Sequence, residues 1–126
     1  MATVALTEQN FKETIDSNDM VIVDFWASWC GPCNAFAPTY EAMSEEYPNI
    51  TFAKVNTEEQ KGLAGHFQIR SIPTLMIFRE QILIFSQPGA LPQDAFKELI
   101  QKASDLDMNM VRAEIEKQQA EQASQA

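Results

Sequence analysis

The segment Met20–Trp26 constrains the fold more than any other part of this chain. It is an almost unbroken run of aliphatic, β-branched and aromatic residues, which is typical of a strand covered on both faces in a parallel sheet. Similar runs predict further strands at 3–6, 50–55, 75–78 and 82–85, with a turn near 79–81 between the last two. Because such strands need helices on both faces, we predict an α/β protein.

Apolar residues at helical spacing predict helices between these strands, at 7–17, 31–47, 58–67 and 92–103. Thr7 resembles an N-cap with Asn10 three residues later, and Pro92 suits a helix start. Pro38 lies inside the second helix and should kink it. The element order β-α-β-α-β-α-β-β-α predicts a mixed sheet with helices on both faces.

Length, charge and hydropathy exclude several classes of protein. The 126 residues, 45% of them apolar, are enough for one globular domain with its own core. The net charge of −9 argues against nucleic acid or an anionic membrane as the main partner. No run approaches the roughly 18–20 apolar residues of a membrane span, and residues 1–7 lack the features of a secretory signal. We therefore expect a cytoplasmic protein.

The only two cysteines lie in the motif Trp29-Cys30-Gly31-Pro32-Cys33. A disulfide between them closes too short a loop to stabilise a fold. A tetrahedral zinc site would need a second pair of Cys or His ligands, and the chain has a single histidine, which we expect on the exposed face of the third helix. No bound metal is therefore expected, and redox chemistry remains.

The motif directly follows a buried strand and opens a helix, so Cys30 is expected at the helix N-terminus. Free N–H groups and the helix dipole there favour a thiolate, which is the nucleophilic form of cysteine. Cys33, one turn further along, would be the resolving thiol. Gly31 and Pro32 carry no charge that would stabilise the thiolate further, and this favours a reducing protein.

Asp24 is a carboxylate within the apolar run. If it is buried, its pKa should rise, which would suit it to exchange a proton with Cys33, and Lys54 on a neighbouring strand could be its counter-ion. The alternative is that Asp24 lies at a solvent-exposed end of the strand and Lys54 is an ordinary surface residue. Similarly, Pro73 before a strand indicates either a cis bond or only a change of chain direction. Periodicity does not choose between these alternatives.

The last segment, residues 105–126, is rich in Gln, Ala and Glu and contains five acidic and two basic residues. Ser104 and Asp107 resemble a helix start, and Met108, Val111 and Ile115 have helical spacing. We treat residues 1–104 as the domain and 105–126 as a C-terminal helical extension. It is either a solvated, fraying tail or a helix that docks on a partner or a second copy.

Several segments together resemble the thioredoxin family in order and spacing, over roughly residues 1–104. They are Val23-Asp24-Phe25-Trp26-Ala27-Ser28-Trp29-Cys30-Gly31-Pro32-Cys33, Ala37-Pro38, Phe52-Ala53-Lys54-Val55-Asn56, Ile69-Arg70-Ser71-Ile72-Pro73-Thr74 and Pro88-Gly89-Ala90. The chain departs from the family pattern at four places. Asn34 replaces a basic residue, Arg79-Glu80-Gln81 replaces a Gly-containing turn, Pro88 replaces an apolar β-former, and the tail beyond residue 104 has no counterpart in the minimal family.

The resemblance implies a thioredoxin fold and a protein-disulfide reductase. Cys30 would be the nucleophile, Cys33 the resolving thiol, Asp24 the buried acid/base and Lys54 its neighbour. Pro73 would be a cis-proline facing the cysteines. The substrate-binding residues would be Trp29, Gly31, Pro32, Ile72, Pro73, Gly89 and Ala90.

The family's partners are a flavin-dependent, NADPH-fed thioredoxin reductase and disulfide-containing protein substrates, and the protein itself needs no bound cofactor. We expect a monomer, with a dimer formed through the tail as the alternative. Two other functions compete with the reductase. One is a thioredoxin-fold binding module dedicated to one partner, with redox chemistry secondary, and the other is an oxidant or isomerase of exported proteins. The Gly-Pro pair and the lack of a signal argue against the last.

Overall fold

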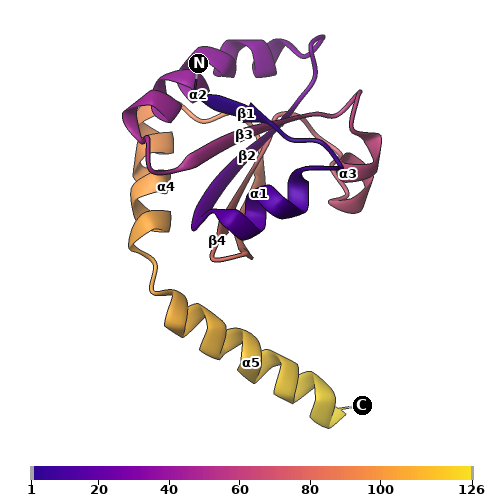
Figure 1. Ribbon diagram of the computed structural model, residues 1–126, viewed down its shortest axis with the longest axis vertical. Coiled ribbons are helices and arrows are strands. Elements are labelled where there is room, and N and C mark those ends of the chain that lie inside the picture. Colours follow the sequence, from indigo (N-terminus) through magenta and orange to yellow (C-terminus); the bar gives the residue numbers. More distant parts are fainter. Residues whose placement is uncertain (1, 126) are drawn as a thin grey trace.

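A computed structural model describes residues 2–125 of the chain and shows a central sheet flanked by helices, with a long helix leading away at the C-terminus (Figure 1). The elements are β1 (Thr3–Ala5), α1 (Phe11–Ser17), β2 (Met20–Trp26), α2 (Gly31–Glu46), β3 (Thr51–Asn56), α3 (Lys61–His66), β4 (Thr74–Arg79), β5 (Ile82–Pro88), α4 (Gln93–Asp105) and α5 (Met108–Gln125).

The five strands form one mixed sheet in the order β1-β3-β2-β4-β5. β3 pairs parallel with both β1 and β2, whereas β4 pairs antiparallel with β2 and β5. The predicted α/β architecture with a mixed sheet is thus confirmed. β2 lies at the centre of the sheet and is buried from Met20 to Phe25, as its unbroken apolar run predicts.

Alternation along the strands divides the core between the two faces of the sheet. On one face, side chains such as Ile22 and Phe52 pack against Tyr40 of α2 and Phe96 of α4. On the other face, strand residues pack against helices α1 and α3: the buried members are Val21, Val23, Phe25, Ala53, Val55, Met76 and Phe78, with Ile15 and Leu63. Asp24 alternates with Val23 and therefore lies on the α2 face, with Ile22.

Two helix starts differ from the predicted ones because local side-chain bonds hold the chain in turns. Thr7 and Asn10 bond reciprocally, each side-chain oxygen accepting the other's N–H (2.7 and 3.3 Å), but the helix begins only at Phe11. Asn56 Oδ1 accepts the N–H groups of Glu58 and Glu59, so α3 starts at residue 61 instead of 58.

The last strand also differs in detail from expectation. β5 continues to Pro88, which pairs with Thr74, instead of ending near residue 85. α2 contains Pro38, as predicted. The single histidine, His66, is exposed on α3, as predicted.

The tail is helical and begins close to the predicted start. Asp107 Oδ1 accepts the N–H groups of Asn109 (2.9 Å) and Met110 (3.3 Å) at the first turn of α5. Met108 is buried against the domain, whereas most residues beyond 112 are exposed. No helix within residues 2–125 combines the length and apolar character needed to cross a membrane.

Candidate redox site

The cysteine pair lies at the N-terminus of α2, just after the loop that connects β2 to α2. Cys30 is the N-cap residue of α2, and the backbone N–H of Cys33 donates to its Sγ at 3.2 Å. The two residues form a disulfide with their Cα atoms 5.2 Å apart, and both are nearly buried. Pro32 lies in the first helical turn, where its missing N–H leaves no helical bond unmade. A negative charge on Cys30 Sγ would thus face the N–H groups of a helix end.

Asn34 stabilises the loop that carries the pair. Its side-chain amide donates to the carbonyl oxygen of Ser28 at 3.1 Å, while its backbone N–H donates to the carbonyl of Cys30 at 3.0 Å. The residue therefore ties the start of α2 to the loop that precedes it. Sequence reasoning noted Asn34 only as a departure from the family pattern, because nothing in the local sequence indicates a bond to Ser28.

A second loop faces the cysteines. The Ile72–Pro73 peptide bond is cis, which decides between the two alternatives for this proline. The carbonyl oxygen of Ile72 lies 3.8 Å from Cys30 Sγ, and the Ile72 side chain packs against the two cysteines. Gly89 completes this side of the site, because its N–H donates to the carbonyl of Pro73 at 2.7 Å.

The predicted substrate-binding residues, here called the rim, are mostly exposed. Trp29 is 68% exposed, and its indole N–H donates to Glu58 Oε1 at 2.7 Å. Gly31, Pro32, Gly89 and Ala90 are exposed, whereas Ile72 is half-buried and Pro73 is buried. Glu58 was missed by the sequence analysis, since it lies 29 positions from Trp29 and only the fold brings the two together.

Asp24 is buried, with 1% of its surface exposed. Within residues 2–125, neither of its carboxylate oxygens has a hydrogen-bond partner. Burial is the main cause that raises the pKa of Asp24 to about 7, and the charge of Lys54 opposes this rise. Of the two predicted alternatives for Asp24, the structure shows the buried carboxylate.

Lys54 is the register partner of Asp24 in the parallel β2–β3 pair. Its ammonium group, however, lies over the ring of Trp26 at 4.7 Å from the ring centroid, and the structure shows no ion pair between it and Asp24. The proposed counter-ion therefore makes no direct contact with the carboxylate. The charge of Lys54 still lowers the pKa of Asp24, although its ammonium group lies over the aromatic ring.

Comparison with known proteins agrees with this geometry. A sequence model of the family described as Thioredoxin matches residues 2–123. The chain belongs to the thioredoxin family. It is 52% identical over 120 residues to the "Putative thioredoxin 2" of Streptomyces coelicolor, covering 95% of this chain and 90% of that protein. It is 41% identical over 103 residues to "Thioredoxin 1" of a Nostoc species, covering 80% of this chain and 96% of that protein.

Among solved structures, the chain is similar to that of a Plasmodium falciparum thioredoxin, with a TM-score of 0.74 and 36% identity, covering 79% of this chain and 98% of that one. The thioredoxin fold and the family resemblance are thus confirmed, and the protein is a thioredoxin-like thiol–disulfide oxidoreductase. Thioredoxins need no bound cofactor, and thioredoxin reductase and disulfide-containing proteins are the partners that the family implies. Within residues 2–125, no three His, Cys, Asp or Glu side chains are grouped so that they could hold a metal ion.

Proposed function

We propose that the protein reduces disulfides of protein substrates by a two-step exchange in which Cys30 attacks and Cys33 resolves. The Cys30 thiolate attacks one substrate sulfur, which forms a mixed disulfide and releases the other sulfur as a thiolate. Cys33 then loses its proton and attacks Cys30 Sγ, which releases the second substrate thiolate and leaves the Cys30–Cys33 disulfide. Two electrons pass from the protein to the substrate. The observation that carries the proposal is the position of Cys30 as N-cap of α2, with the Cys33 N–H on its sulfur.

Asp24 would take the proton of Cys33 during the second step. Alternation along β2 places the carboxylate on the face that α2 covers, and Cys33 lies in the first turn of α2. A pKa of about 7 is suited to proton exchange near neutral pH. Lys54 would tune this pKa. It lines a surface pocket of about 310 Å³ together with Trp26.

The rim would bind substrate as an extended strand. The cis peptide Ile72–Pro73 presents the Ile72 carbonyl next to Cys30, where it could accept a hydrogen bond from a substrate backbone. Trp29, Gly31 and Pro32 would contact the substrate on the cysteine side. Ile72, Pro73, Gly89 and Ala90 would contact it on the opposite side, where the Gly89–Pro73 bond aligns the two loops.

We further propose that the protein is recycled by a thioredoxin reductase that draws electrons from NADPH, and that it serves electron transport and redox homeostasis in the cytoplasm. The net charge of −9 favours a monomer that binds neither nucleic acid nor anionic membranes. Residues 1–104 would carry the catalysis and residues 105–126 an accessory role. This division is supported by the separation of the redox pair and α5, which lie towards opposite ends of β2 (Figure 1).

The direct test is NADPH-coupled reduction of insulin disulfides with a thioredoxin reductase, comparing the wild type with Cys30→Ser and Cys33→Ser. We expect turnover by the wild type and none by either variant, and we expect Cys33→Ser to accumulate a mixed disulfide with insulin through Cys30. Trapping through the other cysteine, in Cys30→Ser, would contradict the assigned roles.

A module dedicated to one partner remains the second candidate, and the capped, ordered α5 is the observation that favours it. The test is a chain truncated after Ile115, which retains the buried Met108 and the contacts of Arg112. A general reductase should keep full insulin reduction after this truncation. A chain that reduces insulin chemically but is not recycled by thioredoxin reductase would support the dedicated module instead.

A further inference from the structure

The turn between β4 and β5 has an unusual backbone for its residues. Glu80 and Gln81 have φ angles of 50° and 71°, in the left-handed region that glycine adopts at little cost and other residues rarely adopt. Such a conformation persists at non-glycine residues when surrounding contacts determine it, and it is a reason to search for a role of the side chains. The contacts of Glu80 and its neighbour Arg79 supply that role.

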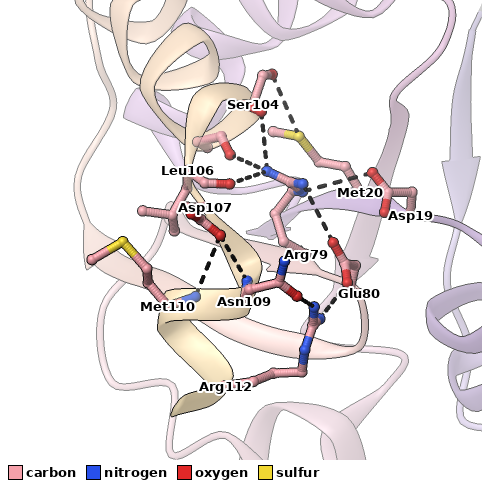
Figure 2. Close-up of polar contacts among 11 residues, drawn as sticks. Asp19, Met20, Arg79, Glu80, Ser104, Leu106, Asp107, Asn109, Met110 and Arg112 are labelled. Atoms are coloured by element: carbon pink, nitrogen blue, oxygen red, sulfur yellow. Dashed lines mark hydrogen bonds and ion pairs between the residues drawn. The ribbon is translucent and has the colours of Figure 1, made fainter. Parts of the chain in front are cut away.

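Arg79 is a buried cation that caps the end of α4. Its Nη1 donates to the carbonyl oxygens of Ala103 at 2.6 Å and Ser104 at 3.1 Å, and lies 3.4 Å from that of Leu106 (Figure 2). The last carbonyls of a helix have no partner within the helix, and a cation there also interacts favourably with the helix dipole. Arg79 therefore holds the segment that joins α4 to α5 against the end of the sheet.

Glu80 extends this contact to the tail. Its carboxylate accepts a hydrogen bond from Arg112 of α5, and it also lies 3.6 Å from Nη2 of Arg79 (Figure 2). Arg112 in turn donates from Nη2 to Asn109 Oδ1 at 2.5 Å, one helical turn earlier in α5. The Glu80 carboxylate thus lies between two guanidinium groups, one belonging to the sheet and one to the tail.

These contacts lie at the end of β2 that is remote from the cysteines. Met20, the first residue of β2, pairs with Arg79, whereas Phe25, near its last residue, pairs with Thr74 beside the cis-proline. At about 3.3 Å per residue, the length of β2 separates the two ends by about 20 Å. Figure 1 shows α5 leading away from the fold at this remote end.

We propose that Arg79, Glu80 and Arg112 form an electrostatic clasp that holds α5 as a fixed arm at the pole of the domain opposite the redox pair. The clasp accounts for a charged side chain at a turn position where glycine would be less strained. It also means that a protein held by the outer part of α5 would leave the rim around Cys30 open. The Glu80–Arg112 pair is half-exposed, so its contribution should weaken as salt is added.

The test is hydrogen–deuterium exchange of the full chain, read by mass spectrometry over residues 108–115. Arg112→Gln and Glu80→Gln each remove one side of the pair. The matched control is Lys102→Gln, which also removes one positive charge and one ion pair, with Glu98, on the exposed face of α4. We expect exchange in 108–115 to accelerate about two- to fivefold in both clasp variants, as the loss of one exposed ion pair allows, and to stay at the wild-type rate in the control.

The Glu80→Gly variant distinguishes the effect of the ion pairs from the effect of backbone strain. It relieves the left-handed conformation while it removes the carboxylate, so we expect faster exchange in 108–115 without loss of thermal stability of the domain. Salt at about 1 M should accelerate the same segment in the wild type. Wild-type exchange rates in Glu80→Gly, or equal rates in Arg112→Gln and Lys102→Gln, would overturn the proposal. Insulin reduction should stay unchanged in all four variants. Its loss would contradict the expectation that the contacts of Arg79, Glu80 and Arg112 do not affect the redox pair.

Discussion

Asp24 and Lys54 are paired in the register of β2 and β3, yet the Lys54 ammonium group lies over the Trp26 ring instead of against the Asp24 carboxylate. Burial therefore outweighs the nearby positive charge, and the pKa of Asp24 rises to about 7. A carboxyl group with this pKa makes both stability and reactivity depend on pH around neutrality.

Asp24→Asn should stabilise the protein at neutral and higher pH. The pKa of Asp24 is about 7 in the folded state against an ordinary value of 3.8, so the folded state binds this proton more tightly than the unfolded state does. Stability from this group is full below about pH 4 and is lost as the pH rises through 7, by up to about 4 kcal/mol. Urea unfolding at pH 4, 7 and 9 should show the wild type falling progressively below the variant. Glu45→Gln, at an exposed position on α2, should show no such divergence.

Lys54→Met should raise the pKa of Asp24 further, because the Lys54 charge is the one effect that lowers it. A ¹³C NMR titration of the Asp24 carboxyl carbon in the reduced protein measures this pKa directly. The control is Lys61→Met at the exposed start of α3, which should leave the titration of Asp24 in place. An unchanged midpoint in Lys54→Met would show that this charge effect is absent.

Tyr40→Phe should cost about 1–3 kcal/mol of unfolding free energy. The buried Tyr40 hydroxyl donates to the carbonyl oxygen of Ala53 at 2.6 Å and lies 2.9 Å from that of Ile22, so it joins α2 to the centre of the sheet. Phenylalanine keeps the packing of the ring but removes this buried hydrogen-bond donor. Tyr47→Phe, at a half-buried position at the end of α2, provides the control in the same urea experiment and should change stability by less than about 0.5 kcal/mol.

Gly89→Ala should destabilise the fold and weaken substrate reduction. The added Cβ would meet no atom within 4 Å, so its whole cost comes from the φ angle of 105°, and we expect at least about 1 kcal/mol. Strain there should also disturb the Gly89–Pro73 hydrogen bond and raise the KM for insulin. Gly65→Ala makes the same change inside α3 with open space around the Cβ, and it should stabilise by about 0.4–1 kcal/mol. The same sign for both variants would contradict this explanation.

Particular residues show how far sequence reasoning reaches. The bounds of β2 were predicted from its apolar run, and the place of Cys30 at a helix start followed from the strand that precedes it. The starts of α1 and α3 were misplaced, because side-chain bonds from Asn10 and Asn56 stabilise turns at positions where helical spacing also fits. Among the site residues, neither the Glu58–Trp29 bond nor the Asn34–Ser28 bond could be predicted, because no pattern in the neighbouring sequence indicates them.

The amino-acid sequence by itself determined the alternation of strands and helices, the redox motif at a helix N-terminus and the helical character of the tail. These features depend on periodicity, capping and composition over a few neighbouring residues, which can be read along the chain. Only the tertiary structure decided that Asp24 is buried, that Lys54 turns to Trp26, and that the Ile72–Pro73 bond is cis beside Cys30. It also decided that Glu80 reaches Arg112, 32 positions away. Such contacts join residues far apart in the chain, and their energies depend on burial and distance that exist only once the sheet and its helices have packed.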